Sequence, residues 1–264
     1  MIDRATRSAT FDMGESHYHP YYELYYLLSG HSRLFINHTI YYVDPGDIIL
    51  ISPSALHKAF YGDSKKAERF TVNFTHDYVR FFWENCLEEY FCPIFSRVKL
   101  SIPPSRQHFV ENLLMKMEQE SLISDPYSAI QIKSLLFQFL VFLGRCQNQK
   151  QPPQLLEQGD NTIQEAAHYI YDNRREALNL QTVAKAVHMS PTYFSKRFKE
   201  ATGFGFKEYL TYLRIQDGEQ LLRTTNLSVT EVGLICGFSD GNYFGDAFKK
   251  ATGLSPKQFR KTSS

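Results

Sequence analysis

The last third of this sequence contains an internal repeat, and this repeat restricts the possible folds more than any other feature. Residues 193–203 (YFSKRFKEATG) recur fifty positions later as residues 243–253 (YFGDAFKKATG), with seven of the eleven residues identical. A short apolar-periodic segment and a turn precede each copy. The repeat therefore indicates one helix-turn-helix unit that is used twice within a helical domain.

Signals for helix starts and helix ends flank both copies. Asn179, Ser190 and Ser228 precede apolar-periodic segments, and they are of the residue types that cap a helix N-terminus. Gly203 and Gly253 follow the second helix of each copy, as glycine commonly does where a helix ends. These signals predict four short helices arranged as two similar pairs.

A longer helix is predicted between the two pairs, over residues 207–223. At 1.5 Å per residue it spans on the order of 25 Å, which with its flanking helices suits one DNA turn of about 34 Å. Residues 161–264 carry 14 Lys and Arg against 10 Asp and Glu, whereas residues 1–160 carry 15 against 18. A basic C-terminal part favours a polyanionic partner. The pattern predicts an all-α domain whose second helices enter two successive segments of a DNA major groove.

Two longer motifs carry a resemblance to a known family. They are LQTVAKAVHMSPTYFSKRFKEATG from residue 180 and SVTEVGLICGFSDGNYFGDAFKKATGLSPKQFR from residue 228. Together they strongly resemble the DNA-binding domain of the AraC/XylS family of bacterial transcription regulators. The resemblance implies a ligand-responsive regulator without catalytic activity that binds a double-stranded DNA operator. It further implies a homodimer, with RNA polymerase as an additional candidate partner; the sign of regulation stays open, with an activator as the first expectation.

The resemblance also assigns DNA contacts by position. Five side chains on the second helices are expected to face bases: Thr192, Ser195, Lys196, Asn242 and Asp246. Four lysines are candidates for phosphate contacts, although solvated lysines are an equal alternative: Lys199, Lys207, Lys249 and Lys257. Asn242 is suited to adenine and Lys196 to guanine. Because Gly241, Gly245 and Asp246 replace longer or basic residues, we expect the first unit to supply most of the direct readout and the second to supply positioning and shape.

Other positions of the repeat are predicted to be structural. Six aromatic residues are expected in the core: Tyr193, Phe194, Phe198, Tyr243, Phe244 and Phe248. Gly218 and Gly233 stand where the family typically has alanine, and each is expected to cost up to about 1 kcal/mol of helix propensity. The alternative to DNA binding is an all-helical bundle that merely contains a duplication.

The N-terminal part has a different texture. From about Ser16 to Val72, short runs rich in Tyr, Ile, Leu, Val and Phe alternate with turn signals, which predicts a β-sandwich or a small barrel. Residues 62–69 are expected to form an exposed hairpin loop. Beyond Pro103-Pro104 two apolar helices follow, which either cap the barrel or form a dimer interface. Their expected apolar faces are Phe109, Leu113, Leu114 and Met117 in the first, and Ile130, Ser134, Phe137 and Val141 in the second.

A cluster of polar residues in the β part resembles the cupin-like sensor domain of the same family. His17, His19 and Glu23 have equal parity, so on a strand all three face one side, the barrel interior. With His57 from a later strand they match the metal-binding set of metal cupins, and that set suits Zn, Fe or Mn. The leading interpretation is a pocket for a small effector without metal or cofactor, and a purely structural cluster is a third alternative.

The effector-binding candidates are His17, His19, Glu23, Tyr25, Arg33 and His57. A sugar is the first candidate effector, because buried Tyr offers an apolar face and a polar tip. The whole sequence thus predicts a two-domain α+β chain. Residues 1–147 form a cupin-like β-barrel with two capping or dimerisation helices, residues 148–161 (NQKQPPQLLEQGDN) form a linker, and residues 162–264 form the DNA-binding domain with its two helix-turn-helix units and joining helix.

The remaining features exclude several other classes. The four cysteines form no CxxC pair, as expected for free thiols in a reducing cytosol. No signal peptide is evident, and the most apolar run, residues 135–143, is far shorter than the ~18 residues of a membrane span; we therefore expect a cytoplasmic protein with no membrane partner. Two alternatives stay open: a metal-binding cupin enzyme fused to a DNA-binding module, and a thiol-based redox regulator that acts through Cys86 and Cys92.

Overall fold

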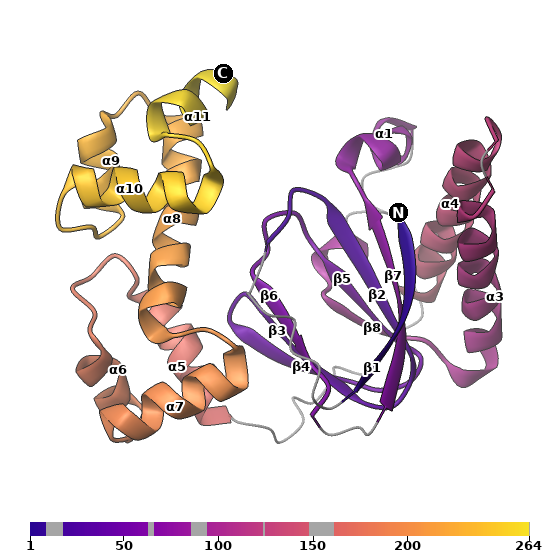
Figure 1. Ribbon diagram of the computed structural model, residues 1–264, viewed down its shortest axis with the longest axis horizontal. Coiled ribbons are helices and arrows are strands. Elements are labelled where there is room, and N and C mark those ends of the chain that lie inside the picture. The colour runs from indigo at the N-terminus through magenta and orange to yellow at the C-terminus, as the bar shows by residue number, and fades with distance from the viewer. Residues whose placement is uncertain (9–17, 63–65, 86–93, 124, 148–160, 264) are drawn as a thin grey trace. The chain divides into compact units, whose positions relative to one another are not determined.

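The computed structural model describes residues 1–8, 18–62, 66–85, 94–123, 125–147 and 161–263. The chain divides into two compact units, Met1–Glu157 (unit 1) and Gln158–Ser264 (unit 2), as Figure 1 shows. The predicted linker falls almost entirely outside the described residues, and the first helix of unit 2 begins at Asn161.

Unit 1 is built on two antiparallel sheets. The larger has the strand order β1 (Ile2–Ser8), β7 (Lys66–Phe74), β2 (Tyr22–Ser29), β5 (Asp47–Ile51) and β8 (Lys99–Ser101). The smaller has the order β4 (Thr39–Val43), β3 (Ser32–Ile36) and β6 (His57–Phe60). Among the described residues, hydrogen bonding does not join the sheets into a closed barrel. The predicted strand-rich, cupin-like domain is therefore confirmed, but the described residues form two antiparallel sheets rather than the predicted closed barrel.

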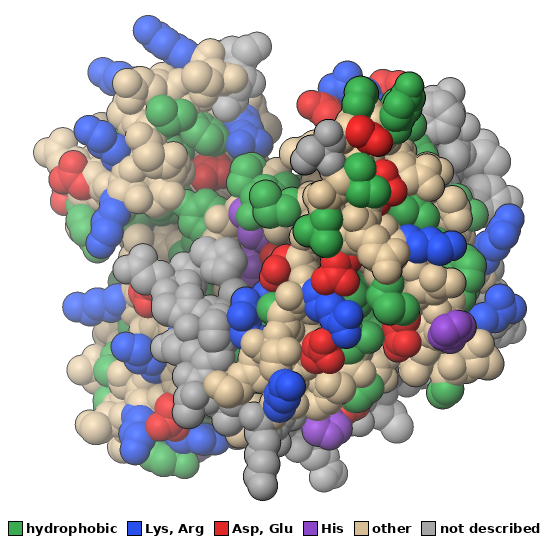
Figure 2. Space-filling model, turned by 45° about the vertical axis from the view of Figure 1, so that its right-hand side comes forward, with side chains coloured by type: hydrophobic (Ala, Val, Ile, Leu, Met, Phe, Trp, Pro, Cys, Tyr) green, Lys and Arg blue, Asp and Glu red, His purple; other side chains and the backbone are tan. Residues whose placement is uncertain are grey.

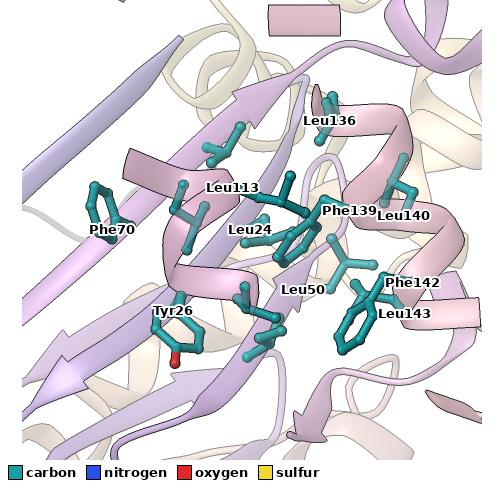
Figure 3. Close-up of a cluster of buried hydrophobic side chains, with 14 of the residues drawn as sticks. Leu24, Tyr26, Leu50, Phe70, Leu113, Leu136, Phe139, Leu140, Phe142 and Leu143 are labelled. Carbon is teal, nitrogen blue, oxygen red and sulfur yellow. The ribbon is translucent and has the colours of Figure 1, made fainter. Parts of the chain in front are cut away.

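The two faces of the larger sheet are covered by different layers. Side chains alternate between faces along a strand, so that in β2 Tyr25 and Leu27 pack with Leu34 of the smaller sheet. Leu24 and Tyr26 point the opposite way, into a second cluster with the helices α3 (Pro104–Ser121) and α4 (Ser128–Gln147). Figure 3 shows this second cluster. The order of layers is thus small sheet, large sheet and helices, and a further helix, α1 (His76–Asn85), follows β7.

The helices α3 and α4 cap the larger sheet, which is one of the two arrangements that the sequence predicted. Parts of the buried faces differ from the predicted ones. In α4 the buried apolar side chains are Leu135, Leu136, Phe139, Leu140, Phe142 and Leu143, while Ile130 is 68% exposed. In α3 Val110 is buried in place of Phe109, which is largely exposed. The predicted face of α4 included Ser134, which lies with Gln131 and Gln138 on the exposed polar side of the helix, whereas Leu135 and Phe139 lie on the buried side. Dimerisation through these helices stays a prediction.

The length and composition of Ser128–Cys146 are also sufficient for a membrane span, contrary to the expectation from its shorter apolar run. One third of this stretch is buried within unit 1, in the cluster with the larger sheet. The core helix of a globular domain passes the same test of length and composition.

A second correction concerns residues 62–69. The sequence suggested an exposed loop, but Lys66 to Arg69 belong to β7 and pair with β1 and β2. Charged residues at the start of this strand hide its alternation, since Ala67 faces the smaller sheet and Phe70 faces the helices.

Unit 2 is all-α, as predicted. Its helices are α5 (Asn161–Asp172), α6 (Leu180–Ala186), α7 (Pro191–Thr202), α8 (Phe206–Thr224), α9 (Val229–Ile235), α10 (Gly241–Thr252) and α11 (Pro256–Ser263). The predicted caps are confirmed: the side chains of Asn179, Ser190 and Ser228 accept hydrogen bonds from backbone N–H groups of the helices they precede. Gly203 and Gly253 end α7 and α10 in the left-handed conformation.

The core of unit 2 contains four of the six predicted aromatic residues. Phe194, Phe198, Phe244 and Phe248 are fully buried, whereas Tyr193 and Tyr243 are each 54% exposed. The prediction was wrong for these tyrosines, because each directly precedes a buried Phe and therefore points about 100° away from it around the helix.

Candidate nucleic-acid interface and effector pocket

The helices α7 and α10 present equivalent exposed positions. Their phenylalanines face the core, so the opposite faces carry the side chains that the sequence assigned to bases. Thr192, Lys196 and Lys199 lie along the outside of α7, with Ser195 half-buried between them. Asn242, Asp246 and Lys249 occupy the same positions fifty residues later, and all are exposed. Each helix thus offers polar side chains one turn apart on one face, the spacing that α-helical contact with base edges requires.

In the first helix-turn-helix unit, the residues of α7 line one open groove. It lies along α6 and α7 and is lined by Leu180, Gln181, Pro191, Thr192, Ser195, Lys196, Lys199 and Glu200. Three of the five predicted base contacts and one predicted phosphate contact therefore lie together. Lys196 also lies 3.9 Å from Glu200 (Nζ to Oε1), an exposed pair that contributes little to stability.

The second helix-turn-helix unit offers fewer long side chains on the exposed face of α10. The side chain of Asp240 caps α10 by accepting hydrogen bonds from the backbone N–H groups of Asn242 and Tyr243, at 2.9 and 2.8 Å. Gly245 faces open space, and Asp246 is exposed. A surface with a carboxylate and a glycine, where α7 has a lysine and a serine, attracts DNA less strongly.

The lysines predicted to contact phosphates are all exposed. Lys207 and Lys257 lie in the first turns of α8 and α11, and Lys199 and Lys249 lie in the last turns of α7 and α10. On the face that Figure 2 shows, Lys and Arg side chains are spread over unit 2, while unit 1 has acidic and basic side chains intermixed. This distribution agrees with the charge asymmetry of the sequence.

The turns of the two units differ by one residue. His188 and Gly237 both have positive φ, 55° and 87°, and they follow α6 and α9 at equivalent places. A Cβ atom on Gly237 would lie 2.6 Å from the backbone oxygen of Arg175, so the second turn requires glycine for both its conformation and its close packing. Ser239 is the additional residue before the next cap. The second turn therefore packs against the segment that leads into the first unit.

The closing arginine of the family motif has a structural role. Arg260 donates hydrogen bonds to the backbone oxygens of Leu222 and Leu227, at 3.3 and 2.5 Å. These bonds hold α11 to the end of α8.

The candidate effector residues of unit 1 divide into two groups. His19, Glu23 and His57 meet on one side: the Nε2 atom of His19 lies 3.4 Å from Oε2 of Glu23, and the two imidazole rings are 4.9 Å apart. His19 and His57 are buried and Glu23 is nearly so. The parity argument was only partly right, because β2 begins at Tyr22 and His19 reaches Glu23 from the preceding loop. His17 lies outside the described residues, so its role stays a prediction.

Positive neighbours hold the Glu23 carboxyl in its charged form. Burial acts to raise the pKa of Glu23, but a hydrogen bond from His19 and the nearby His57 and Arg69 outweigh it, so the pKa lies below its ordinary value. A buried carboxylate of this kind is ready to bind a cation or a hydrogen-bond donor.

Tyr25 belongs to the same inward face, whereas Arg33 does not. The hydroxyl of Tyr25 donates to Oγ of Ser32 at 2.9 Å, and burial raises the pKa of this tyrosine. Arg33 alternates with Leu34, which faces the core between the sheets, and its guanidinium lies over the ring of Phe60 at 4.9 Å. Arg33 thus points away from the cluster, and its assignment to the same pocket was wrong.

Two inward-facing residues of β7 were missed from sequence. Arg69 donates to Oγ1 of Thr71 at 2.7 Å and lies 5.8 Å from the ring centre of Tyr25. Thr71 pairs with Tyr25 across the strands. The alternation of these polar residues with Phe70 and Val72 is the sequence signal for their inward orientation, but the charged residues before them resemble a loop.

The cysteines of the alternative redox interpretation, Cys86 and Cys92, lie outside the described residues. Cys146 is half-buried and Cys236 is buried, and neither is in a disulfide.

Comparisons with known proteins agree with this arrangement. The family model described as the AraC-like ligand binding domain matches residues 4–140, and the model described as a helix-turn-helix domain matches residues 183–262. The arabinose operon regulatory protein of Escherichia coli strain K12 is 29% identical over 218 residues, covering 82% of this chain and 72% of that protein.

Two further similarities concern shorter parts. The transcriptional activator RhaS of Escherichia fergusonii is 30% identical over 155 residues, covering 58% of this chain and 53% of that protein, so the match spans about half the length of that relative. The C-terminal domain of AraT, a response regulator from Geobacillus stearothermophilus, is 34% identical, covers 40% of this chain and 88% of that chain, and gives a TM-score of 0.38. Since the ligand-binding model matches just over half of the chain and the helix-turn-helix model most of the remainder, the chain belongs to the AraC family of transcription regulators.

Proposed function

We propose that this AraC-family regulator binds one operator through two successive major-groove segments, with α7 and α10 as the recognition helices. The observation that carries the proposal is the equivalence of the two helices: each is capped, each buries two phenylalanines, and each exposes polar side chains at the same positions. Thr192, Ser195, Lys196, Asn242 and Asp246 are the proposed base contacts. Lys199, Lys207, Lys249 and Lys257 are the proposed phosphate contacts.

The two units contribute differently. Lys196 in the groove of the first unit is suited to donate to guanine, whereas Asp246 at the equivalent place would repel phosphate unless it accepts a hydrogen bond from cytosine. The first unit therefore supplies most of the direct readout and the second supplies positioning and shape.

The effector of this regulator binds at the inward polar face of unit 1. His19, Glu23, His57 and Tyr25 lie there, with Arg69 beside them. Such a face has both donors and acceptors next to an aromatic ring, which suits a small polar ring such as a sugar. Effector binding at this face controls either the affinity of the regulator for its operator or its activity once it is bound to DNA.

Further parts of the proposal concern assembly and setting. The chain acts in the cytoplasm as a homodimer, without catalytic activity, and contacts RNA polymerase as an activator. Exposed apolar side chains on and near the capping helices support self-association: Phe109, Leu122, Ile123, Tyr127 and Ile130. Relatives that are transcription regulators support a regulatory rather than an enzymatic role.

The experiment that tests the function has two parts. Selection from random-sequence duplex DNA with the purified full-length protein should enrich one operator with two contacted segments, and recovery of no preferred sequence would refute operator binding. Thermal unfolding with a panel of sugars, aromatic acids and divalent metals then tests the effector. A ligand at a hundred times its Kd adds about 2.7 kcal/mol. In Glu23→Ala the effector response should disappear while operator binding without effector is unchanged; a normal response would show that the effector binds elsewhere.

A further inference from the structure

His19, Glu23 and His57 place three ligand atoms of metal-binding type close together. One ligand atom from each residue lies within 4.8 Å of the other two. They come from three places in the fold: the loop before β2, β2 itself and the start of β6. Because each is held by a different part of the backbone, the cluster is a feature of the folded domain rather than of one local segment.

The hydrogen bonds of the two imidazoles determine their tautomers. Nδ1 of His19 lies 2.8 Å from the backbone oxygen of Tyr21, and Nδ1 of His57 lies 2.9 Å from that of Ala55. A carbonyl oxygen only accepts hydrogen bonds, so Nδ1 carries the hydrogen in both rings. In the neutral ring Nε2 then has the lone pair, and in His19 this atom faces the Glu23 carboxylate.

The distance of 3.4 Å between Nε2 of His19 and Oε2 of Glu23 allows one cation to bridge the two atoms. A proton on Nε2 of His19 would join two of the three ligand atoms. A metal ion would join all three, including Nε2 of His57. The cluster therefore offers two imidazole nitrogens and one carboxylate oxygen as ligand atoms.

This donor set has the chemistry of a transition-metal site. Two imidazoles and one carboxylate are a recurrent ligand set for zinc and for non-haem iron. In a tetrahedral zinc site, bonds of about 2.0–2.2 Å place ligand atoms roughly 3.3–3.5 Å apart, and the separation between His19 and Glu23 already has this value. All three ligand atoms lie within 4.8 Å of one another, so the remaining separations must shorten when an ion binds.

The surroundings also support metal binding. Metal-bound imidazoles usually donate their other N–H to a carbonyl or a carboxylate, which fixes the ring, and Tyr21 and Ala55 supply such carbonyls here. The ring of Tyr21 stacks on His19 at 3.9 Å with an interplanar angle of 5°, so it further restrains the orientation of that ligand.

We infer that His19, Glu23 and His57 together bind a divalent transition-metal ion within the ligand-binding domain. The inference deepens the proposed function, since it concerns the proposed effector pocket. Three protein ligands leave open coordination positions. The ion is therefore either the effector itself or a resident ion to which an oxygen-bearing effector binds, and the operator experiment below distinguishes these sources.

The test uses the full-length protein, stripped with a chelator and dialysed. Isothermal titration with Zn²⁺ should give one bound ion per chain, and Mg²⁺, which imidazole suits poorly, should not bind at this site. Titration with Co²⁺ should give visible absorption bands of a nitrogen- and oxygen-ligated ion. His57→Ala removes a direct ligand and should weaken Zn²⁺ binding by more than the roughly ten- to hundredfold typical for the loss of an outer partner of a ligand. The matched control His31→Ala, at an exposed histidine of the same domain, should bind as the parent does.

Two results would overturn the inference: no Zn²⁺ binding by the folded parent, or unchanged binding by folded His57→Ala. Should His57→Ala fail to fold, the nearly isosteric Glu23→Gln provides the same comparison. Operator binding measured with and without Zn²⁺ separates the two sources, because an effector metal changes operator affinity and a resident metal leaves it unchanged. If the protein binds an operator but no Zn²⁺, the metal site is refuted and the proposed function stands. If it binds Zn²⁺ but prefers no operator sequence, the metal site stands and the proposed function is refuted.

Discussion

Both carboxylate oxygens of Asp217 accept hydrogen bonds from the guanidinium of Arg174, at 3.0 and 3.1 Å. Arg175 adds a third hydrogen bond to the same carboxylate at 2.7 Å, and Asp217 is only 7% exposed. One turn earlier on α8, Arg214 donates to the backbone oxygens of Arg174 and Glu176, both at 2.7 Å. The segment that leads into α6 and α7 is thereby fixed to α8, which continues to α9 and α10. The ion pair between Asp217 and Arg174 therefore restrains the first helix-turn-helix unit relative to the second.

Asp217→Asn should destabilise unit 2. Removing the charge leaves two arginines beside a neutral amide, and breaking one partner of a buried ion pair typically costs about 3–5 kcal/mol; partial exposure of Arg175 places the expected loss toward the lower end. Denaturant unfolding of the full-length protein measures it. Asp172→Asn, an exposed acidic residue at the end of α5, is the matched control and should change little. An unchanged unfolding midpoint in Asp217→Asn would show that the pair is not stabilising.

The same substitution should relax the spacing that the operator must have. If the pair fixes the two units, the parent protein should bind poorly to an operator with base pairs inserted between the two contacted segments. Asp217→Asn should lose less affinity on such an insertion than the parent does, measured as a ratio of dissociation constants at constant salt. Asp217→Glu, which keeps the charge, should restore much of the parent's selectivity. Equal loss in both proteins would mean that α8 alone sets the spacing.

Gly233→Ala should destabilise the second helix-turn-helix unit, although alanine has a higher helix propensity than glycine. A Cβ atom at Gly233 would lie 2.8 Å from Cβ of Phe244, and one at Gly218 would lie 2.8 Å from the ring of Phe244. Overpacking costs about 1–3 kcal/mol, which exceeds the gain of up to about 1 kcal/mol from replacing a helical glycine. Gly245→Ala on the neighbouring helix meets open space and should be stabilising. Thermal unfolding of both variants gives the comparison, and stabilisation by Gly233→Ala would contradict the close packing.

Lys196→Ala should change sequence preference, whereas Lys249→Ala should change affinity alone. If Lys196 contacts a base, its loss costs about 1–3 kcal/mol and relaxes one position of the operator. Lys249, in the last turn of α10, should behave as a phosphate contact, weakening binding to all sequences similarly and lowering the salt slope by about one. Binding to a panel of single-base operator variants at several salt concentrations measures both. A uniform loss for Lys196→Ala would reassign it to phosphate.

Local signals made unit 2 accurately predictable from sequence. Caps such as Asn179 and Ser228 satisfy backbone donors within their own turn, so their effect depends on a few adjacent residues. The glycines Gly218 and Gly233 show the limit of this approach. Their propensity cost was visible in the sequence, but the reason for them, the ring of Phe244, lies on another helix.

Unit 1 was predicted less well because its site depends on strand register and on loops. The sequence does not show that the strand of Arg33 turns this side chain away from the pocket, and the charged run at residues 66–69 hides the strand that turns Arg69 into it. His19 was placed near Glu23 by an argument about strand parity, yet a loop brings the two together. Pairing between distant segments fixes these directions, and sequence periodicity does not contain that information.

The thiol of Cys236 should be unreactive in the folded protein. Burial raises its pKa to about 11, and the thiolate is the reactive form. Alkylation at pH 8 should therefore be much slower in the native protein than in urea. Because the thiol is favoured in its neutral form by folding, its contribution to stability is complete below the pKa of the unfolded chain, ordinarily about 8.5, and is lost as pH rises toward 11.

Cys236→Ala tests both expectations. The difference in unfolding free energy between the parent and this variant should shrink between pH 8 and pH 11, which separates the thiol from other groups that titrate in this range. Rapid native alkylation of Cys236 would contradict its burial and would make it a candidate redox sensor. The redox alternative through Cys86 and Cys92 has its own test: an oxidant response of operator binding that persists in the Cys86→Ser, Cys92→Ser double variant would exclude it, and an oxidant response lost in that variant would establish it.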